Sequence, residues 1–451
     1  MDDALVGRTA VELAQLVRDG VLDATDVVRA HLGQVAALDP QVGAFQVVRA
    51  ERARAEAAAV SRRPDLGTLP LAGVPVAIKD SISVAGEPMR VGSLATSPAP
   101  STQDHELVRR LRAAGAIVIG KTRVPELCIW GWTDGAFGIA RNPWNLDRTP
   151  GGSSGGSAAS VSAAMVPIAH GSDGGGSIRI PSAACGLVGI KPGSDIVPGD
   201  PGSTGWCGLS CNGPLATTVA DLALTLSVMA GRPELADVTE PAVPLRIAVS
   251  VVSPMPGVKV DPAYEAAALE TGALLARAGH SVTPADPPYR KRTIWAAAVR
   301  SSAGIAQSAQ GLKRSSLERR SRPMVRAGRI AARLVRDGDR ESWRQATAAF
   351  FEDYDVLVTP ALAGIPPVAE GWSRKSFLAN TRAAPFGAFT GVWNVAGYPA
   401  AAVPAGFHPT GMPLSIQLVA PDGRESLLLG VAKQLERLRP WPRHAPMSGA
   451  R

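Results

Sequence analysis

The chain has 451 residues, and 45% of them are hydrophobic, which is ample for a large buried core. Glycine and proline are frequent but spread along the chain, so a low-complexity sequence is excluded. The net charge of +8 includes a basic zone at 290–340, which lacks the interleaved aromatic residues of an RNA-stacking surface. We interpret this zone as a solvated helical face and expect no nucleic-acid partner.

The cysteines and the apolar segments indicate the cellular compartment of the protein and whether a metal or a membrane partner is expected. The four cysteines form no disulfide framework, and Cys207 and Cys211 have no partner pair that would complete a zinc site. We therefore expect a protein of the reducing cytoplasm, without metal or cofactor. The N-terminus lacks the apolar core of a secretory signal, and the small-apolar run at 157–169 is too short to span a bilayer. No membrane partner is expected.

The first 70 residues are predicted to form a helical lead-in. Thr9 and Glu12 match a capping box, the pattern that begins a helix. A second helix is predicted over about 26–37, ending before Pro40, and residues 41–60 continue in helical style.

Beyond residue 70, short apolar strands alternate with helices. Helices are predicted at 105–115 and 157–166, and strands at 74–80, 116–120, 245–252 and 355–362. This alternation predicts an α/β fold, a sheet covered by helices on both faces. No convincing linker divides the chain, so we expect one large domain over 1–451. Its parts would be the lead-in at 1–70, a core at 71–215, a variable helical insertion at 285–350 and a C-terminal return to the core at 352–451.

Two short motif matches fail in their structural context. Residues 115–122 fit the phosphate-loop pattern, but a helix precedes the first glycine and the residues between the glycines are strand-like. Residues 151–155 fit a nucleophile elbow around Ser153, yet the proline-containing segment before them cannot be a regular strand. His170 lies seven residues before Ser177 and is a candidate base, although a structural hydrogen-bonding role is favoured.

A third set of residues is more specific because its members occur together. VPVAIKD carries Lys79, TPGGSSGGSA carries Ser153, and GSDGGGSIRIP carries Ser177, which lies 24 residues after Ser153 (177 − 153). With blocks such as LRAAGAIVIGKTRVPEL and ARNPWNLDRTPGGSSGGSAA, the chain resembles the amidase signature family over nearly its whole length. Stand-alone bacterial amidases are the most similar members. The resemblance implies a single large domain with a twisted mixed central sheet.

The resemblance also implies a Ser-Ser-Lys catalytic unit. Ser177 would be the nucleophile, Ser153 the relay that takes its proton, and Lys79 the base that takes the proton from Ser153. This role requires an uncharged lysine, which burial favours, and the apolar run before Lys79 is consistent with a buried site. The backbone N–H groups expected to bind the oxyanion are those of Gly174, Gly175, Gly176 and Ser177. The family further leads us to expect a cis peptide bond between Gly152 and Ser153.

The expected reaction is hydrolysis of a small, linear carboxamide to an acid and ammonia or an amine, through an acyl-enzyme. Its partner is then a small-molecule amide, and a homodimer is left open. Candidate residues of the pocket wall are Ile129, Trp130, Trp132 and Trp393, which would favour an apolar or aryl acyl group; ordinary core positions are the equal alternative for the tryptophans.

Three rival functions remain to be weighed. A glutaminase subunit of a tRNA-dependent amidotransferase belongs to the same family, but such subunits carry glutamine where this chain has Ile180. An acyltransferase would pass the acyl group to an amine and shares the first half-reaction. A catalytically silent binding protein is disfavoured because Lys79, Ser153 and Ser177 are all intact.

Overall fold

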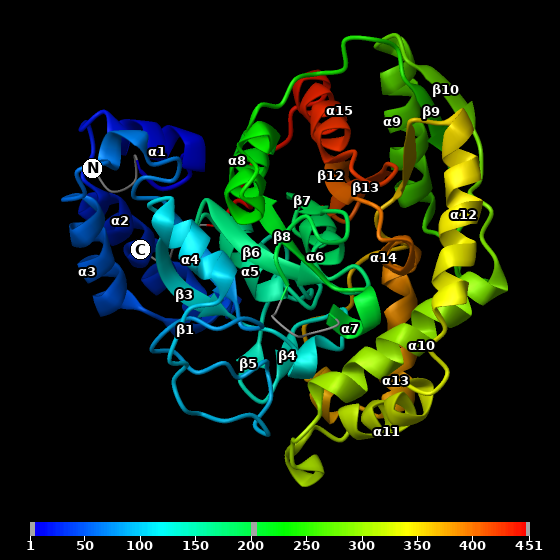
Figure 1. The fold of residues 1–451 in the computed structure, drawn as a ribbon, viewed down its shortest axis with the longest axis horizontal. Coiled ribbons are helices and arrows are strands. Elements are labelled where there is room, and N and C mark those ends of the chain that lie inside the picture. Colours follow the sequence, from blue (N-terminus) through cyan, green and yellow to red (C-terminus); the bar gives the residue numbers. More distant parts are fainter. Residues whose placement is uncertain (1–4, 200–204, 448–451) are drawn as a thin grey trace.

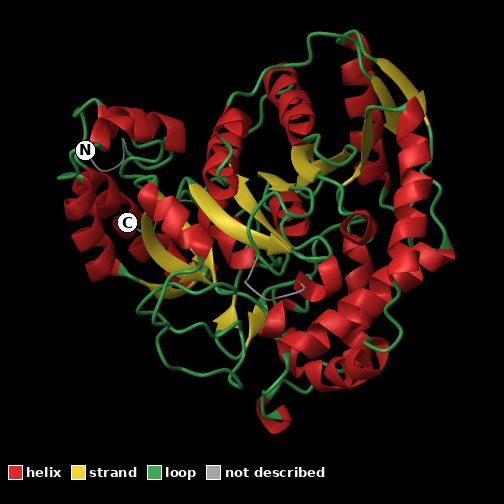
Figure 2. Cartoon of the chain, viewed as in Figure 1, coloured by secondary structure: helices red, strands yellow, loops and turns green. Residues whose placement is uncertain are grey.

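The computed structural model describes residues 5–199 and 205–447, and within them one mixed sheet runs through the molecule (Figure 1). Its eleven described strands lie in the order β1-β3-β2-β6-β8-β7-β12-β13-β11-β9-β10. Helices flank the sheet, as Figure 2 shows in red against yellow strands. The α/β architecture predicted from the alternation of helices and strands is confirmed.

The strands of the first half place the site. They are β1 (Phe45–Val48), β2 (Pro75–Lys79), β3 (Ile117–Thr122), β6 (Ile168–Asp173), β7 (Val188–Lys191) and β8 (Cys211–Ala216). Strand β2 is parallel to both β3 and β6, and all five of its residues are buried. Because parallel strands buried on both faces read as continuous apolar runs, the run before Lys79 is a reliable strand signal.

The second half of the sheet is built from the C-terminal part of the chain. Its strands are β9 (Arg246–Val249), β10 (Ser281–Pro284), β11 (Val356–Pro360), β12 (Ala400–Phe407) and β13 (Pro413–Val419). The two halves join where β12 pairs antiparallel with β7. A separate small hairpin consists of β4 (Asp134–Gly135) and β5 (Gly138–Ile139).

The lead-in differs from the sequence prediction in two respects. Its helices are α1 (Ala10–Arg18), α2 (Ala24–Val42) and α3 (Ala50–Val60), and the predicted capping box begins α1. Helix α2 continues through Pro40 instead of ending before it, and Gly43 closes it in the left-handed conformation at φ 64°. Residues 41–60 are not continuously helical, because β1 pairs with β3 and this long-range pairing overrides the local helical pattern.

The helices against the first half of the sheet are α4 (Glu106–Ala113), α5 (Gly155–Ser162), α6 (Arg179–Ala184) and α8 (Val219–Ala230). Every residue of α5 is buried. Gly156 explains why small residues are needed there, since a Cβ at this position would lie 2.6 Å from the backbone nitrogen of Arg123. Helix α5 therefore packs closely enough to hold the residues before it in the core.

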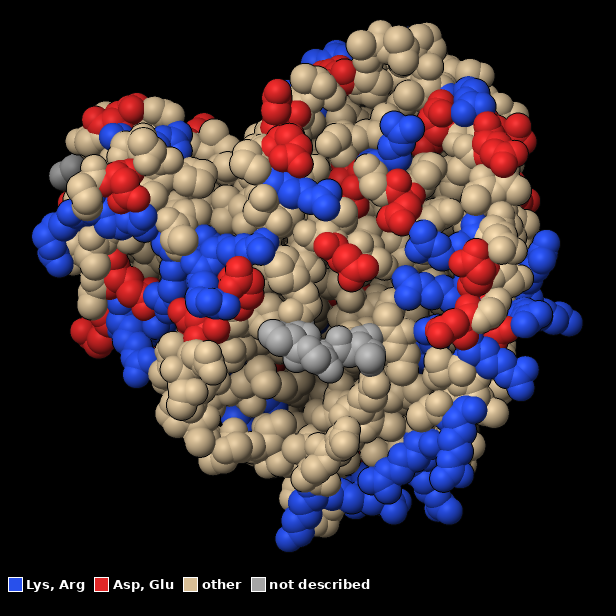
Figure 3. Space-filling view, viewed as in Figure 1, with Lys and Arg blue, Asp and Glu red and all other residues tan. Residues whose placement is uncertain are grey.

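The insertion forms a helical layer at one side of the sheet. It contains α10 (Lys291–Ser308), α11 (Ser321–Ala331) and α12 (Asp337–Asp353). Figure 3 shows lysine and arginine side chains gathered at its lower right, where Figure 1 places α10 and α11, and Arg326 and Arg329 are exposed there. The remaining helices are α7 (Gly205–Gly208), α9 (Pro262–Arg277), α13 (Phe377–Ala383), α14 (Gly391–Ala396) and α15 (Glu425–Leu438).

Buried polar groups attach the insertion to the core. The Arg320 guanidinium donates to the Asp134 carboxylate at 2.8 Å, and both side chains are buried. The backbone N–H of Glu318 donates to the Glu126 carboxylate at 2.8 Å. No helix in the described part of the chain is long and apolar enough to cross a membrane.

Candidate active site

Lys79 is the last residue of β2, and its side chain is fully buried. Its Nζ lies 2.8 Å from Ser153 Oγ, 3.0 Å from the Ser172 carbonyl oxygen and 2.9 Å from Ser172 Oγ. Burial lowers the pKa of Lys79, and the nearby Cys128 and Asp173 oppose that shift only in part. The lysine is thus placed to be an uncharged amine in contact with a serine hydroxyl.

Ser153 lies in the segment that enters α5, and it is 1% exposed. The peptide bond between Gly152 and Ser153 is cis, as the family resemblance led us to expect. Gly152 is fixed by close packing, because a Cβ there would lie 2.6 Å from the Trp130 carbonyl oxygen. The backbone before Ser153 is therefore too crowded for any residue other than glycine.

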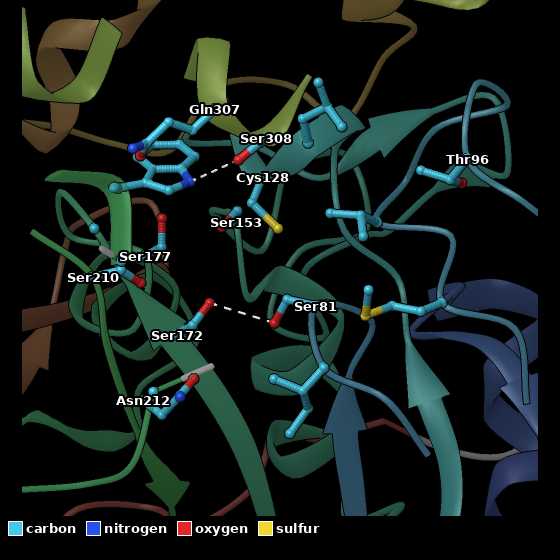
Figure 4. A pocket seen from close by; sticks show the side chains of 18 of the residues that line it. Ser81, Thr96, Cys128, Ser153, Ser172, Ser177, Ser210, Asn212, Gln307 and Ser308 are labelled. Atoms are coloured by element: carbon cyan, nitrogen blue, oxygen red, sulfur yellow. Dashed lines mark hydrogen bonds between the residues drawn. The ribbon is translucent and has the colours of Figure 1, made fainter. Parts of the chain in front are cut away.

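Ser177 lies in the turn between β6 and α6, and it is half-buried. It lines the same cavity as Ser153, and Figure 4 shows the two serines near one another at its edge. The backbone N–H of Ser154 donates to the Ser177 carbonyl oxygen at 3.2 Å, which ties the two segments together. Within the described residues no hydrogen bond joins the two hydroxyl groups directly.

The glycines of this turn divide into two groups. The Gly176 N–H donates to Asp173 Oδ1 at 2.6 Å, so it is directed at a carboxylate and not into the cavity. In the described part of the chain, the N–H groups of Gly174, Gly175 and Ser177 have no hydrogen-bond partner. The Gly176 N–H thus helps to hold the turn in place, while the other three amides of the expected oxyanion site have no protein partner among the described residues.

A buried ion pair between Arg179 and Asp173 supports the turn that contains Ser177. Arg179 and Asp173 are both fully buried, and Arg179 Nε and Nη2 each donate to the Asp173 carboxylate at 3.0 Å. Burial alone would raise the pKa of Asp173, but the Arg179 charge and hydrogen bonds outweigh it and hold that pKa well below its usual range. Asn394 Nδ2 donates to the same carboxylate at 2.9 Å. Asp173 is thus a permanent anion that binds backbone N–H groups on both sides of Ser177.

The cavity beside the serines has a volume of about 780 Å³. Its described lining residues are all uncharged, with hydroxyl and carboxamide groups between apolar side chains. The lining residues fall into three groups: Ser81, Ile82, Met89, Val91, Thr96, Ser97, Ala99 and Ser101 from the loop after β2; Leu127, Cys128, Ser153, Ser172, Gly174 and Ser177 from the core; and Gly199, Gly205, Trp206, Ser210, Asn212, Gln307, Ser308, Gln310 and Leu312 from α7, the start of β8, the end of α10 and the segments next to them.

The four residues expected in the pocket wall lie outside this lining. Trp130 and Trp132 stack on each other with centroids 5.5 Å apart, and they are 4% and 1% exposed. Trp393 is fully buried in a second aromatic cluster, and Ile129 packs against the core. The core alternative therefore describes these tryptophans, and the wall contains Trp206 instead. No sequence periodicity marks Trp206, because it lies in an irregular segment rich in glycine.

Lys121 of the phosphate-loop match and the candidate base His170 both have structural roles. Lys121 forms an ion pair with Asp80 at 2.5 Å, and it lies in strand β3, so the phosphate-loop match is a strand end and not a nucleotide site. His170 Nε2 is 3.1 Å from Asn212 Oδ1, a structural hydrogen bond within the sheet. No cluster of metal-ligating side chains occurs among the described residues.

The comparisons with known proteins place the chain among the amide hydrolases. The chain belongs to the amidase family, whose model, described as Amidase, matches residues 26–429. It is 42% identical to a Mycobacterium tuberculosis protein named "Putative amidase AmiB2", over 97% of each chain. It is 33% identical to the 6-aminohexanoate-cyclic-dimer hydrolase of Paenarthrobacter ureafaciens, over 97% of this chain and 96% of that protein.

The fold comparison agrees with the sequence comparison. A solved structure of a 6-aminohexanoate cyclic dimer hydrolase with its substrate superposes with a TM-score of 0.85 and 31% identity. The superposition covers 96% of this chain and 97% of that chain. Both matches extend over nearly the whole chain, so the family assignment applies to the sheet, the insertion and the site together.

Proposed function

We propose that the protein hydrolyses the C–N bond of a small carboxamide through an acyl-enzyme on Ser177. The observation that carries the proposal is the 2.8 Å contact between the buried amine of Lys79 and the Ser153 hydroxyl, at the edge of a cavity that Ser177 also lines. A buried lysine whose pKa is lowered is the base that a serine nucleophile needs when no histidine is in reach.

The three contacts of Lys79 suit a neutral amine. Its two N–H groups can be donated to the carbonyl oxygen and the hydroxyl of Ser172, and its lone pair then faces the hydroxyl of Ser153. The Ser153 proton can pass to Lys79 as Ser153 receives the proton of Ser177. Substrate binding would bring the two serine hydroxyls into contact, since catalytic hydrogen bonds often tighten only in the complex.

The reaction then proceeds in two halves. Ser177 Oγ forms a bond to the carbonyl carbon, and the oxyanion accepts hydrogen bonds from the free backbone N–H groups of the turn. The C–N bond breaks as the relay returns the proton to the leaving nitrogen, and ammonia or an amine departs. Water next attacks the ester, its proton passes to the relay, and the carboxylic acid leaves with Ser177 restored.

The relatives support amide hydrolysis and leave the substrate open. The name of one relative specifies a cyclic dimer of 6-aminohexanoate as its substrate, and a second is named as an amidase. Acyl transfer to an amine shares the first half-reaction, and product analysis distinguishes it from hydrolysis. Because all four cysteines are free thiols, we also propose the reducing cytoplasm as the compartment of the protein.

A serine-directed alkyl fluorophosphonate tests the nucleophile without knowledge of the substrate. Attack by Ser177 Oγ forms an O–P bond and expels fluoride, and the mass of the peptide that contains Ser177 rises by the phosphonyl group. Labelling should disappear in Ser177→Ala and slow at least about 1,000-fold in Lys79→Met, because the nucleophile loses its base. Ser316→Ala, at an exposed serine of the insertion, is the matched control and should label as the wild type does. Full labelling in Lys79→Met would exclude the relay.

A further inference from the structure

We propose that Trp206 selects amides that carry an uncharged aromatic group, which packs against its indole inside the cavity. The proposal rests on the function proposed above and names the substrate class of the same site. Four kinds of observation carry it: the place of Trp206, the contacts that fix its indole, its backbone conformation, and the character of the rest of the lining.

Trp206 reaches the nucleophile turn itself. It lines the cavity together with Ser177, and a Cβ placed on Gly174 would lie 3.2 Å from Cε3 of the indole. The six-membered ring therefore occupies the space in which a side chain at position 174 would lie, beside the turn whose N–H groups would hold the oxyanion. An aromatic group attached to the amide, on either side of the C–N bond, comes within reach of this ring when the carbonyl carbon is at Ser177.

The indole is held in one orientation by helix α10. Its Nε1 donates to Ser308 Oγ at 3.0 Å, the bond drawn as a dashed line to Ser308 in Figure 4. At Gly304, one turn earlier, a Cβ would lie 2.6 Å from Cγ of Trp206, so the ring base fills the space that a side chain would need. A ring that is already fixed loses little conformational entropy when a ligand packs on it, which favours selectivity.

The backbone of Trp206 also departs from the common regions. Its φ of 55° and ψ of 52° are left-handed values, uncommon for a bulky side chain. Cys207, which follows, has φ 55° and ψ 39° as well. The segment thus adopts an unfavourable conformation that places the indole against both α10 and the nucleophile turn. Such local strain is concentrated at ligand sites, where the surroundings enforce it.

The remaining lining suits an uncharged ligand. Among the described lining residues, none is aspartate, glutamate, lysine, arginine or histidine. A charged group would lose its hydration on entering without gaining a partner of opposite charge. A cation would in addition oppose the positive charge that Lys79 must acquire when it takes the proton. Ser308, labelled in Figure 4, accepts from Trp206 through its hydroxyl oxygen, and its O–H can donate to a neutral polar group of a ligand.

Matched amides measure the contribution of the aromatic ring. One pair, benzamide and cyclohexanecarboxamide, differs on the acyl side, and another, acetanilide and N-cyclohexylacetamide, differs on the amine side. For each pair, the ratio of kcat/KM values is compared between the wild type and Trp206→Leu, so that the intrinsic reactivity of each amide cancels. We expect the aromatic member to lose roughly tenfold relative to its partner in at least one pair.

Two further variants distinguish a loss of preference for aromatic amides from a general effect of tryptophan substitution on folding. Trp206→Phe keeps an aromatic ring without the Nε1 bond and should retain most of the preference. Trp295→Leu, at a tryptophan that is 56% exposed on α10, should leave both ratios unchanged. If the ratios in Trp206→Leu equal those of the wild type in both pairs, the proposal is overturned.

Charge is tested with one ring and three substituents. The amides are 4-methylbenzamide, 4-(aminomethyl)benzamide and 4-carbamoylbenzoate, which are neutral, cationic and anionic at pH 7.5. We expect the neutral amide to exceed both charged ones at least about tenfold in kcat/KM, and a charged amide that equals it would refute this part of the proposal.

The proposed function and this inference fail differently. If amide hydrolysis through Ser177 is wrong, neither fluorophosphonate labelling of Ser177 nor hydrolysis of any of these amides is seen. If only the inference is wrong, Ser177 is labelled and amides are hydrolysed, but the ratios do not respond to the substitution of Trp206.

Discussion

Replacing Arg179 by methionine should destabilise the protein severely, because it leaves the Asp173 carboxylate buried without its counter-charge. Arg179 donates to five acceptor atoms: two oxygens of Asp173, the Thr390 carbonyl oxygen, Gln417 Oε1 and Asn394 Oδ1. Removal of one partner from a buried ion pair typically costs about 3–5 kcal/mol. We expect a loss in this range in the free energy of unfolding.

The effect should reach activity as well. Asp173 accepts hydrogen bonds from the N–H groups of Gly176 at 2.6 Å and Ile178 at 3.2 Å, on either side of Ser177. A carboxylate that is displaced or protonated no longer holds these groups, so the nucleophile loses its position. The fluorophosphonate labelling rate of Ser177 in Arg179→Met should therefore fall even where the variant is still folded, as judged by circular dichroism.

A double substitution tests whether the unpaired charge of Asp173 causes the loss of stability. Asp173→Asn in the Arg179→Met background removes the unpaired charge and keeps an acceptor for the Gly176 N–H. The double variant should thus recover about 1 kcal/mol or more relative to Arg179→Met in urea unfolding followed by tryptophan fluorescence. Arg329→Met, on the exposed face of α11, is the control and should change stability by less than about 0.5 kcal/mol. A loss below about 1 kcal/mol in Arg179→Met, or strictly additive losses in the double variant, would refute it.

Three further predictions concern stability. Burial lowers the pKa of Lys79 from the ordinary 10.5, so as the pH falls below 10.5 the unfolded chain takes up a proton that the folded chain resists. The wild type should therefore lose stability relative to Lys79→Met as the pH falls below 10.5, by at most about 1.4 kcal/mol per pH unit, and a pH-independent difference would contradict this. Burial, together with repulsion from Glu126 and Asp134, raises the pKa of Glu318 to about 7 from 4.5, against the opposing charge of Arg320. Between pH 4.5 and 7 the unfolded chain releases this proton first, so the wild type should lose stability relative to Glu318→Gln by on the order of 3 kcal/mol as the pH rises, measured by urea unfolding across that range. Gly156→Ala should destabilise the protein by about 2 kcal/mol or more, because its Cβ would meet backbone atoms. Gly33→Ala, in α2 with open space around it, should stabilise the protein by about 0.5–1 kcal/mol. Equal melting temperatures of the two variants would contradict the close packing described for α5.

The sequence predicts the structure correctly where a local pattern and the tertiary environment favour the same conformation. The run before Lys79 predicts a buried strand, and β2 is fully buried between two parallel neighbours. The capping box at Thr9 begins α1 because both of its hydrogen bonds form within four residues. Lys79 and Ser153 could be paired from the family resemblance, and the structure places their side chains in direct contact.

Prediction failed where distant segments decide the local structure. Strand β1 exists because it pairs with β3, which lies far along the chain (Phe45 pairs with Thr122, and 122 − 45 = 77), and no local pattern indicates such a partner. The sequence also left open, for the same reason, whether the tryptophans near the catalytic blocks line the pocket or lie in the core. Trp206 acquires its position from Gly304 and Ser308 of the insertion, about 100 residues away, while the tryptophans nearer to the catalytic blocks pack on each other.

The pairing of β7 with β12 has a consequence for how the chain can be divided. The residues proposed to carry the chemistry precede β12 in the chain, and the C-terminal half supplies Asn394 and Gln417, which accept hydrogen bonds from Arg179. A protease cut within the insertion would leave two fragments with strand edges that match only each other: β7 and β9 on one fragment, β12 and β11 on the other. The fragments should reassemble when mixed and regain activity together, and each alone should be prone to aggregate through its open edge.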